Sequence, residues 1–292
     1  MAQFETGSWT SRDGLTLRYR DYAGGADGAD AAQRPAILCL HGLTRNARDF
    51  EQLAGRLAGQ WRVICPDMRG RGESDYARDP MTYNPAQYLD DLEQLLAQLG
   101  LVRFVAIGTS LGGLLTMLLA ASGGGRIAGA VLNDVGPVVE EAGLARIRDY
   151  VGSGRSFETW MHAARGLKDT NAAIYPDYTL EDWLRMAKRL MVVNDAGRIV
   201  FDYDMKIGEP FEIPGGATPA VDLWPLFDGL ASAPLLLVRG EASDILSAET
   251  AAMMAARNPA MAHLVLPRIG HAPTLDEPAS IAAIDTLLAQ VG

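Results

Sequence analysis

Short apolar runs separated by helix-like segments constrain the fold of this 292-residue chain more than any other feature. From Pro35 onward the runs cover residues 36–40, 62–66, 102–107, 127–134, 235–239 and 262–266. Strands buried on both faces have this composition, because helices cover each side of a parallel sheet. The alternation predicts an α/β fold: a doubly wound sheet with right-handed crossovers.

The segments between the runs carry apolar residues at helical spacing. They cover residues 49–58, 86–99, 111–121, 248–257 and 279–290. Before Pro35, residues 3–10 and 15–22 flank a Ser-Arg-Asp-Gly turn, and the second of these ranges alternates apolar and polar side chains. This pattern is typical of a hairpin. We therefore expect a mostly parallel sheet with an antiparallel hairpin at its N-terminal edge.

One long stretch interrupts the alternation of strands and helices. About 100 residues between Asp134 and Ala233 contain no strand-like run, which is too long for a simple loop. We interpret residues 135–232 as a mainly helical cap, or lid, inserted after the sixth strand. The core domain would then comprise residues 1–134 and 233–292.

A serine between two glycines follows the run at 102–107. The sequence there is G-T-S-L-G, and an apolar helix-like segment comes next. A serine at such a strand–helix turn has a strained backbone, and the residues two positions away need to lack side chains. Gly108 and Gly112 meet this requirement, so Ser110 is the predicted nucleophile.

A serine hydroxyl is a weak nucleophile and needs a base. Of the four histidines, His271 alone comes late in the chain on a loop that follows a strand, so it is the predicted base. The base in turn needs a carboxylate. Asp244 follows the run at 235–239 and keeps the order Ser, Asp, His, so it is the preferred acid. Asp134, at the end of the run at 127–134, is the fallback acid.

Two backbone N–H groups are expected to stabilise the oxyanion of an acyl-transfer reaction. The first belongs to Leu111, directly after the nucleophile. The second belongs to Leu43, because Gly42 lets the backbone approach a ligand closely. We expect His41 to order this loop through hydrogen bonds.

Together these motifs resemble the α/β-hydrolase superfamily, in particular its capped serine esterase-like branch. The motifs are H-G at 41–42, D-M-R-G-R-G-E-S at 67–74, G-T-S-L-G-G at 108–113, the Asp244 loop and G-H-A-P at 270–273. The resemblance implies a cap between strands six and seven, and a structural role for the loop at 67–74. Epoxide hydrolases and dehalogenases of this superfamily use an aspartate where this chain has Ser110, which argues against both activities.

The predicted activity is hydrolysis of a small to medium, fairly apolar carboxylic ester or lactone through an acyl-enzyme on Ser110. No cofactor or metal is expected. Trp160, Trp183 and Trp224 are candidates for an apolar pocket wall, although they would pack equally well inside the cap.

Two other functions are compatible with the same motifs. The first is a carbon–carbon hydrolase of ring-cleavage products, in which basic residues of the cap would bind a substrate carboxylate. The candidates for that role are Arg185, Lys188 and Arg189. The second is a hydrolase-like receptor that binds a ligand with negligible turnover.

Charge and composition limit the classes of molecule that this chain is expected to bind. The net charge of −10 disfavours binding to nucleic acid or to an anionic membrane, so a small-molecule substrate is expected and the oligomeric state stays open. The N-terminus lacks the basic and apolar regions of a signal peptide. Cys39 and Cys65 both lie in strand-like runs, as expected of buried thiols in a reducing compartment. These features predict a cytoplasmic protein.

Overall fold

The computed structural model describes residues 3–24, 34–123, 125–212 and 222–291. Its large sheet has the spatial order β1-β2-β4-β3-β5-β6-β10-β11. The strands are β1 (Glu5–Thr10), β2 (Thr16–Tyr22), β3 (Ala36–Leu40), β4 (Val63–Asp67), β5 (Phe104–Thr109), β6 (Ile127–Asn133), β10 (Leu235–Gly240) and β11 (Ala262–Leu266). β2 is antiparallel to β1 and to β4, whereas the other pairs are parallel. The predicted sheet, with its N-terminal hairpin, is confirmed.

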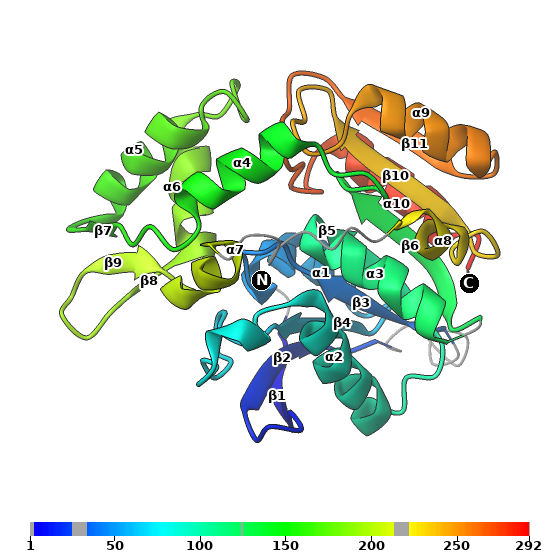
Figure 1. Ribbon diagram of the computed structural model, residues 1–292, viewed down its shortest axis with the longest axis horizontal. Coiled ribbons are helices and arrows are strands. Elements are labelled where there is room, and N and C mark those ends of the chain that lie inside the picture. The colour runs from blue at the N-terminus through cyan, green and yellow to red at the C-terminus, as the bar shows by residue number, and fades with distance from the viewer. Residues whose placement is uncertain (1–2, 25–33, 124, 213–221, 292) are drawn as a thin grey trace.

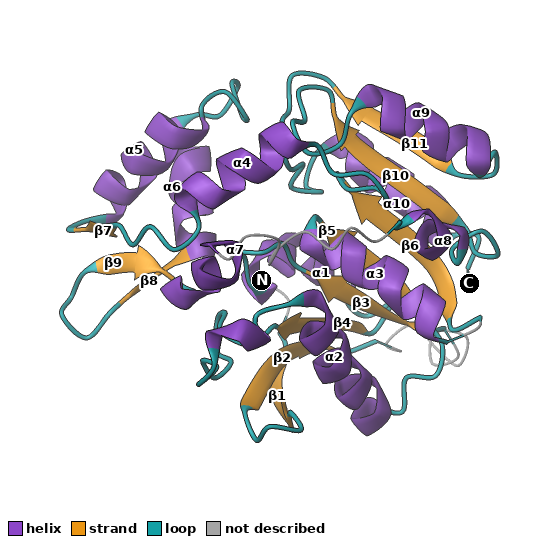
Figure 2. Cartoon of the chain, viewed as in Figure 1, coloured by secondary structure: helices purple, strands orange, loops and turns teal. Residues whose placement is uncertain are grey.

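Helices cover both faces of this sheet (Figure 2). They are α1 (Glu51–Leu57), α2 (Pro85–Leu99), α3 (Leu111–Ser122), α9 (Ala248–Arg257) and α10 (Pro278–Leu288). Successive side chains of a strand point to opposite faces. Leu38 and Leu40 of β3 accordingly pack with α2 and α3, whereas Ile37 and Cys39 pack with α1 and α10. The continuous apolar runs of the sequence are thus buried on both sides.

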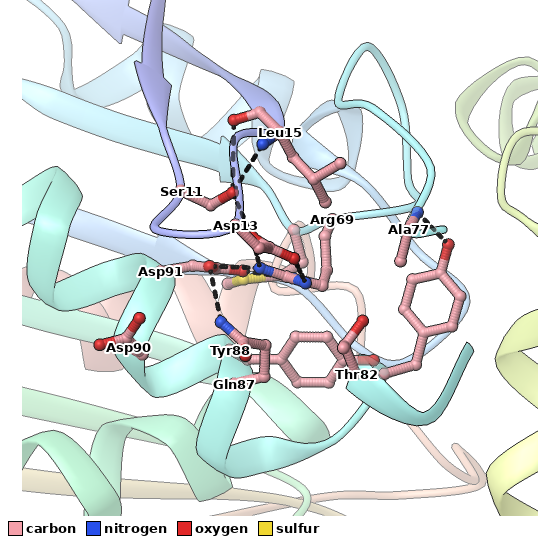
Figure 3. A network of polar contacts seen from close by, with 12 residues as sticks. Ser11, Asp13, Leu15, Arg69, Ala77, Thr82, Gln87, Tyr88, Asp90 and Asp91 are labelled. Atoms are coloured by element: carbon pink, nitrogen blue, oxygen red, sulfur yellow. Dashed lines mark hydrogen bonds and ion pairs between the residues drawn. The ribbon is translucent and has the colours of Figure 1, made fainter. Parts of the chain in front are cut away.

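The loop at 67–74 is fastened to the core by a buried arginine (Figure 3). Arg69 is fully buried, and its Nε and Nη2 atoms each lie 2.7 Å from a carboxylate oxygen of Asp91 in α2. The same guanidinium donates to Asp13 in the β1–β2 turn. These hydrogen bonds lower the pKa of Asp13 to about 2. Arg69 therefore joins the loop to α2 and to the β1–β2 turn.

The described part of residues 135–232 contains both helices and short strands. Its elements are α4 (Glu141–Tyr150), β7 (Ser156–Phe157), α5 (Trp160–Asn171), α6 (Leu180–Leu190), β8 (Met191–Val193), β9 (Ile199–Phe201), α7 (Glu209–Glu212) and α8 (Trp224–Asp228). Figure 1 shows all of these except α8 grouped on one side of the large sheet. Residues 213–221 lie outside the described residues.

Two features of this segment differ from the prediction. β7, β9 and β8 form a small antiparallel sheet that the sequence analysis missed, because apolar runs of three residues, as in β8 and β9, are too short to distinguish a strand from a helix segment. In addition, Phe227 of α8 is buried in the same core cluster as the residues of α3, so the end of the segment packs on the main core. None of the described helices is long and apolar enough to cross a bilayer.

Candidate active site

Ser110 lies at a sharp turn between β5 and α3. Its backbone has φ 53° and ψ −116°, a conformation that is rare for residues other than glycine. The two neighbouring glycines are needed for close packing at this turn. A Cβ atom on Gly108 would overlap the backbone of Gly112, and one on Gly112 would overlap the carbonyl oxygen of Leu40. The predicted elbow geometry therefore depends on both glycines.

A chain of two hydrogen bonds starts at this serine. The Nε2 atom of His271 lies 2.9 Å from Ser110 Oγ, and its Nδ1 atom lies 2.8 Å from Asp134 Oδ2. Asp134 is fully buried, and the side chain of His271 is 9% exposed. The geometry fits an imidazole that carries its proton on Nδ1 and accepts from the serine hydroxyl through Nε2.

The acid beside His271 is Asp134 rather than the preferred candidate, Asp244. Asp134 also accepts hydrogen bonds from the Gly240 amide at 2.9 Å and from the Ser243 hydroxyl at 2.6 Å. Asp244 instead receives both arms of the Arg146 guanidinium, and this hydrogen bonding lowers its pKa. The prediction is corrected for a tertiary reason: the turn after β10 directs Ser243 toward Asp134, and a cation of α4 holds Asp244.

Two side chains that the sequence analysis did not identify hold the loop that carries His271. Asn133, the last residue of β6, donates from Nδ2 to the Pro273 carbonyl at 2.8 Å and to Thr109 Oγ1 at 3.0 Å. The hydroxyl of Tyr175 donates to the Ala272 carbonyl at 2.7 Å. Only the position of Asn133, directly before Asp134 at a strand end, offered a signal in the sequence.

The loop of the predicted oxyanion donor is held from two sides. His41 Nδ1 donates to the Gly42 carbonyl at 2.7 Å, while its Nε2 accepts from the Met68 amide at 3.0 Å. Burial lowers the pKa of His41 to about 4, so the ring is neutral at physiological pH. Arg71 Nε donates to the Leu43 carbonyl at 2.9 Å. Neither the Leu43 nor the Leu111 amide donates to an acceptor among the described residues, so both are available to a ligand.

A cavity of about 500 Å³ opens above Ser110. Ser110, Leu43 and His271 line it from the core, and residues of the 135–232 segment form much of the remaining wall. The apolar part of that wall consists of Ile147, Leu167, Ile174, Met186, Leu190 and Phe201. The cavity can therefore enclose an aliphatic ligand next to the serine hydroxyl.

The three tryptophans that were candidates for the pocket wall do not line this cavity. Trp183 is 1% exposed and packs edge-on against Tyr175 and Tyr178 in the segment's own apolar cluster. Trp160 lies against the same cluster, and Trp224 packs against the main core. The prediction of a tryptophan wall is therefore wrong, and the alternative, packing in the protein's own cores, describes all three.

Only one of the three basic residues proposed to bind a substrate carboxylate lies in the cavity wall. Arg185 pairs with acidic side chains of its own helix, and Lys188 is exposed. Arg189 does line the cavity, where it forms an ion pair with Asp276. Three further arginines of the cavity wall were missed, namely Arg45, Arg146 and Arg155.

Comparison with known proteins matches residues 37–284 to the model of the Alpha/beta hydrolase family. A 3-hydroxybutyrate-oligomer hydrolase from Cupriavidus necator is 36% identical over 87% of this chain and 88% of that protein. A 2-(acetamidomethylene)succinate hydrolase from Mesorhizobium japonicum is 25% identical over 88% of this chain and 85% of its own length. An alpha/beta hydrolase from Novosphingobium aromaticivorans, known from a crystal structure, has 66% sequence identity to this chain. The two structures superpose with a TM-score of 0.94 over 99% of both chains.

Proposed function

Since this chain belongs to the alpha/beta hydrolase family, we propose that it hydrolyses carboxylic esters with Ser110 as nucleophile, His271 as base and Asp134 as acid. The observation that carries the proposal is the pair of hydrogen bonds from Ser110 through His271 to Asp134 at the floor of a cavity. Similarity over 87% of this chain to a relative named 3-hydroxybutyrate-oligomer hydrolase supports an ester as the bond that is cleaved, because hydroxy acids join into oligomers through ester bonds.

The reaction follows from this arrangement. Ser110 Oγ attacks the ester carbonyl carbon while His271 Nε2 takes the hydroxyl proton, and Asp134 stabilises the resulting imidazolium. The Leu43 and Leu111 amides donate to the oxyanion. His271 then returns the proton to the departing alcohol, which leaves an acyl ester on Ser110. Water, deprotonated by His271, attacks this ester, and His271 then returns the proton to Ser110 Oγ as the acid leaves.

The size of the cavity sets the range of substrates. A volume of about 500 Å³ with aliphatic and aromatic side chains in its wall suits a small to medium ester or lactone. Similarity to the 2-(acetamidomethylene)succinate hydrolase supports a second candidate, hydrolysis of an unsaturated dicarboxylate. A receptor without turnover is the least favoured function, because binding alone does not need the hydrogen-bonded Ser110, His271 and Asp134.

The test is turnover of p-nitrophenyl butyrate, a 3-hydroxybutyrate dimer and 2-(acetamidomethylene)succinate by the wild-type protein and by Ser110→Ala. We expect ester turnover by the wild type and a loss of about 10⁵–10⁶-fold in kcat in the variant. Ser8→Ala, which alters an exposed serine of β1 that does not line the cavity, is the matched control and should keep the wild-type rate. Wild-type ester turnover by Ser110→Ala would exclude the proposal, and turnover of the dicarboxylate alone would favour the second candidate.

A further inference from the structure

Arginines are the most numerous charged residues of the cavity wall. Four arginines and two aspartates, Asp49 and Asp149, are the charged lining residues among those described. The carboxylates that pair with these arginines decide which of them can still attract an anionic ligand.

Three of the four arginines have their charge compensated by a carboxylate. The pairs are Arg45 with Asp49, Arg146 with Asp244, and Arg189 with Asp276. Arg45, for example, donates to Asp49 from Nε at 2.6 Å and from Nη2 at 2.9 Å. A cation held in this way has little remaining attraction for a second carboxylate, because its charge is already neutralised.

Arg155 is different. It lies in the loop between α4 and β7, it is exposed, and no carboxylate of the described chain forms an ion pair with it. Asp149 lines the same cavity but does not pair with it either. Arg155 therefore offers a full guanidinium, with all its donors, to whatever fills the cavity.

We propose that Arg155 binds a free carboxylate of the substrate, so that the natural substrate is an ester carrying a carboxylate away from the scissile bond. This inference rests on the proposed ester hydrolysis at Ser110. The aliphatic side chains of Ile147, Leu167 and Ile174 line the same cavity and would contact the carbon chain that joins the two groups. Oligomers of short hydroxy acids have this chemistry: ester bonds, an aliphatic chain and one terminal carboxylate.

The experiment compares two ligands that differ only at the terminal group: a 3-hydroxybutyrate dimer as the free acid and as the carboxamide. Each is titrated calorimetrically into the Ser110→Ala protein and into Ser110→Ala with Arg155→Gln. We expect the free acid to bind Ser110→Ala more tightly than the carboxamide. Arg155→Gln should weaken binding of the free acid about tenfold and change that of the carboxamide by less than about twofold.

The matched control is Arg165→Gln, because Arg165 is an exposed arginine of α5 that does not line the cavity. It should leave both affinities unchanged. In the protein that retains Ser110, Arg155→Gln should raise KM for the free acid and leave kcat unchanged.

Equal affinity of the two ligands, an equal effect of Arg155→Gln on both, or no binding of the free acid would overturn the inference. Consumption of the dimer by Ser110→Ala would instead overturn the proposed nucleophile, while the comparison of affinities would still report on Arg155.

Discussion

Two aspartates near the ends of neighbouring strands have different environments. Asp134 is fully buried and faces His271, whereas the side chain of Asp244 is 34% exposed and is held by Arg146. An acid partner keeps the histidine in the correct tautomer only when it contacts Nδ1 directly. The contact with His271, and not the position after β10, identifies the proposed acid.

Asp134→Asn should therefore lower kcat by about 10³–10⁴-fold, because an amide at this position can favour the wrong tautomer of His271. Asp244→Asn should lower kcat by less than about tenfold, since its ion pair is partly exposed. Steady-state kinetics on p-nitrophenyl butyrate, with circular dichroism to confirm folding, measures both. A larger loss in Asp244→Asn than in Asp134→Asn would restore the original assignment.

His41, which holds the loop after β3, makes the stability of the protein depend on pH. Burial lowers the pKa of His41 from the ordinary 6.5 to about 4 in the folded protein. As the pH falls, the imidazole of the unfolded chain therefore binds a proton before that of the folded protein does. The stabilisation is complete above pH 6.5 and is lost as the pH falls toward 4. Burial raises the pKa of Asp67 to about 6, so protonation of Asp67 in acid favours the folded state, opposite to the effect of His41.

A comparison of the wild type with His41→Asn separates the two groups. The free energy of unfolding of the wild type should fall by about 2 kcal/mol more than that of the variant between pH 7 and pH 5. Urea denaturation at both pH values measures this difference. An identical pH dependence of the two proteins would mean that folding does not lower the pKa of His41.

At the scale of elements, the loop at 67–74 carries two buried arginines with different contacts. Arg69 binds carboxylates of α2 and of the β1–β2 turn, as Figure 3 shows. Arg71 binds the Leu43 carbonyl from Nε, and from Nη1 it binds the Tyr88 hydroxyl and the Arg69 carbonyl. Arg69 therefore joins parts of the core, whereas Arg71 holds the loop of the proposed oxyanion donor Leu43.

Arg71→Met should lower kcat about tenfold to a hundredfold with little change in KM, because a displaced Leu43 amide weakens transition-state binding. Arg71→Lys should recover part of this loss, since an ammonium can still donate to the Leu43 carbonyl.

The matched control for Arg71→Met is Arg69→Met. It should lower the free energy of unfolding by about 3–5 kcal/mol and leave kcat of the folded protein unchanged, because Asp91 would lose its buried partner. Equal kcat values for the two methionine variants would show that Arg71 has a purely structural role.

At the scale of the whole molecule, the 135–232 segment has an apolar cluster of its own and also forms part of the cavity wall. Trp183 belongs to the cluster and does not line the cavity, whereas Ile174 packs at the edge of the cluster and does line the cavity. Stability and substrate preference should therefore respond to different positions of the same segment.

Trp183→Ala should lower the free energy of unfolding by about 3–5 kcal/mol and leave the preferred acyl length unchanged. Ile174→Trp should shift the preference to shorter acyl chains, because the larger side chain occupies cavity volume. Values of kcat/KM across p-nitrophenyl esters from acetate to octanoate, with thermal unfolding, measure both effects. A changed chain-length preference in Trp183→Ala would place its indole in the substrate site.

The sequence by itself determined the features that depend on local pattern. Apolar runs specified the strands of the large sheet, and two glycines at fixed spacing from Ser110 marked the turn, because steric limits act between near neighbours. Only the tertiary structure decided which acid meets His271 and which side chains line the cavity. Arg146 and Asp244 are 98 positions apart, and Ser110 and His271 are 161 positions apart. Such contacts depend on how helices and loops pack rather than on any pattern along the chain.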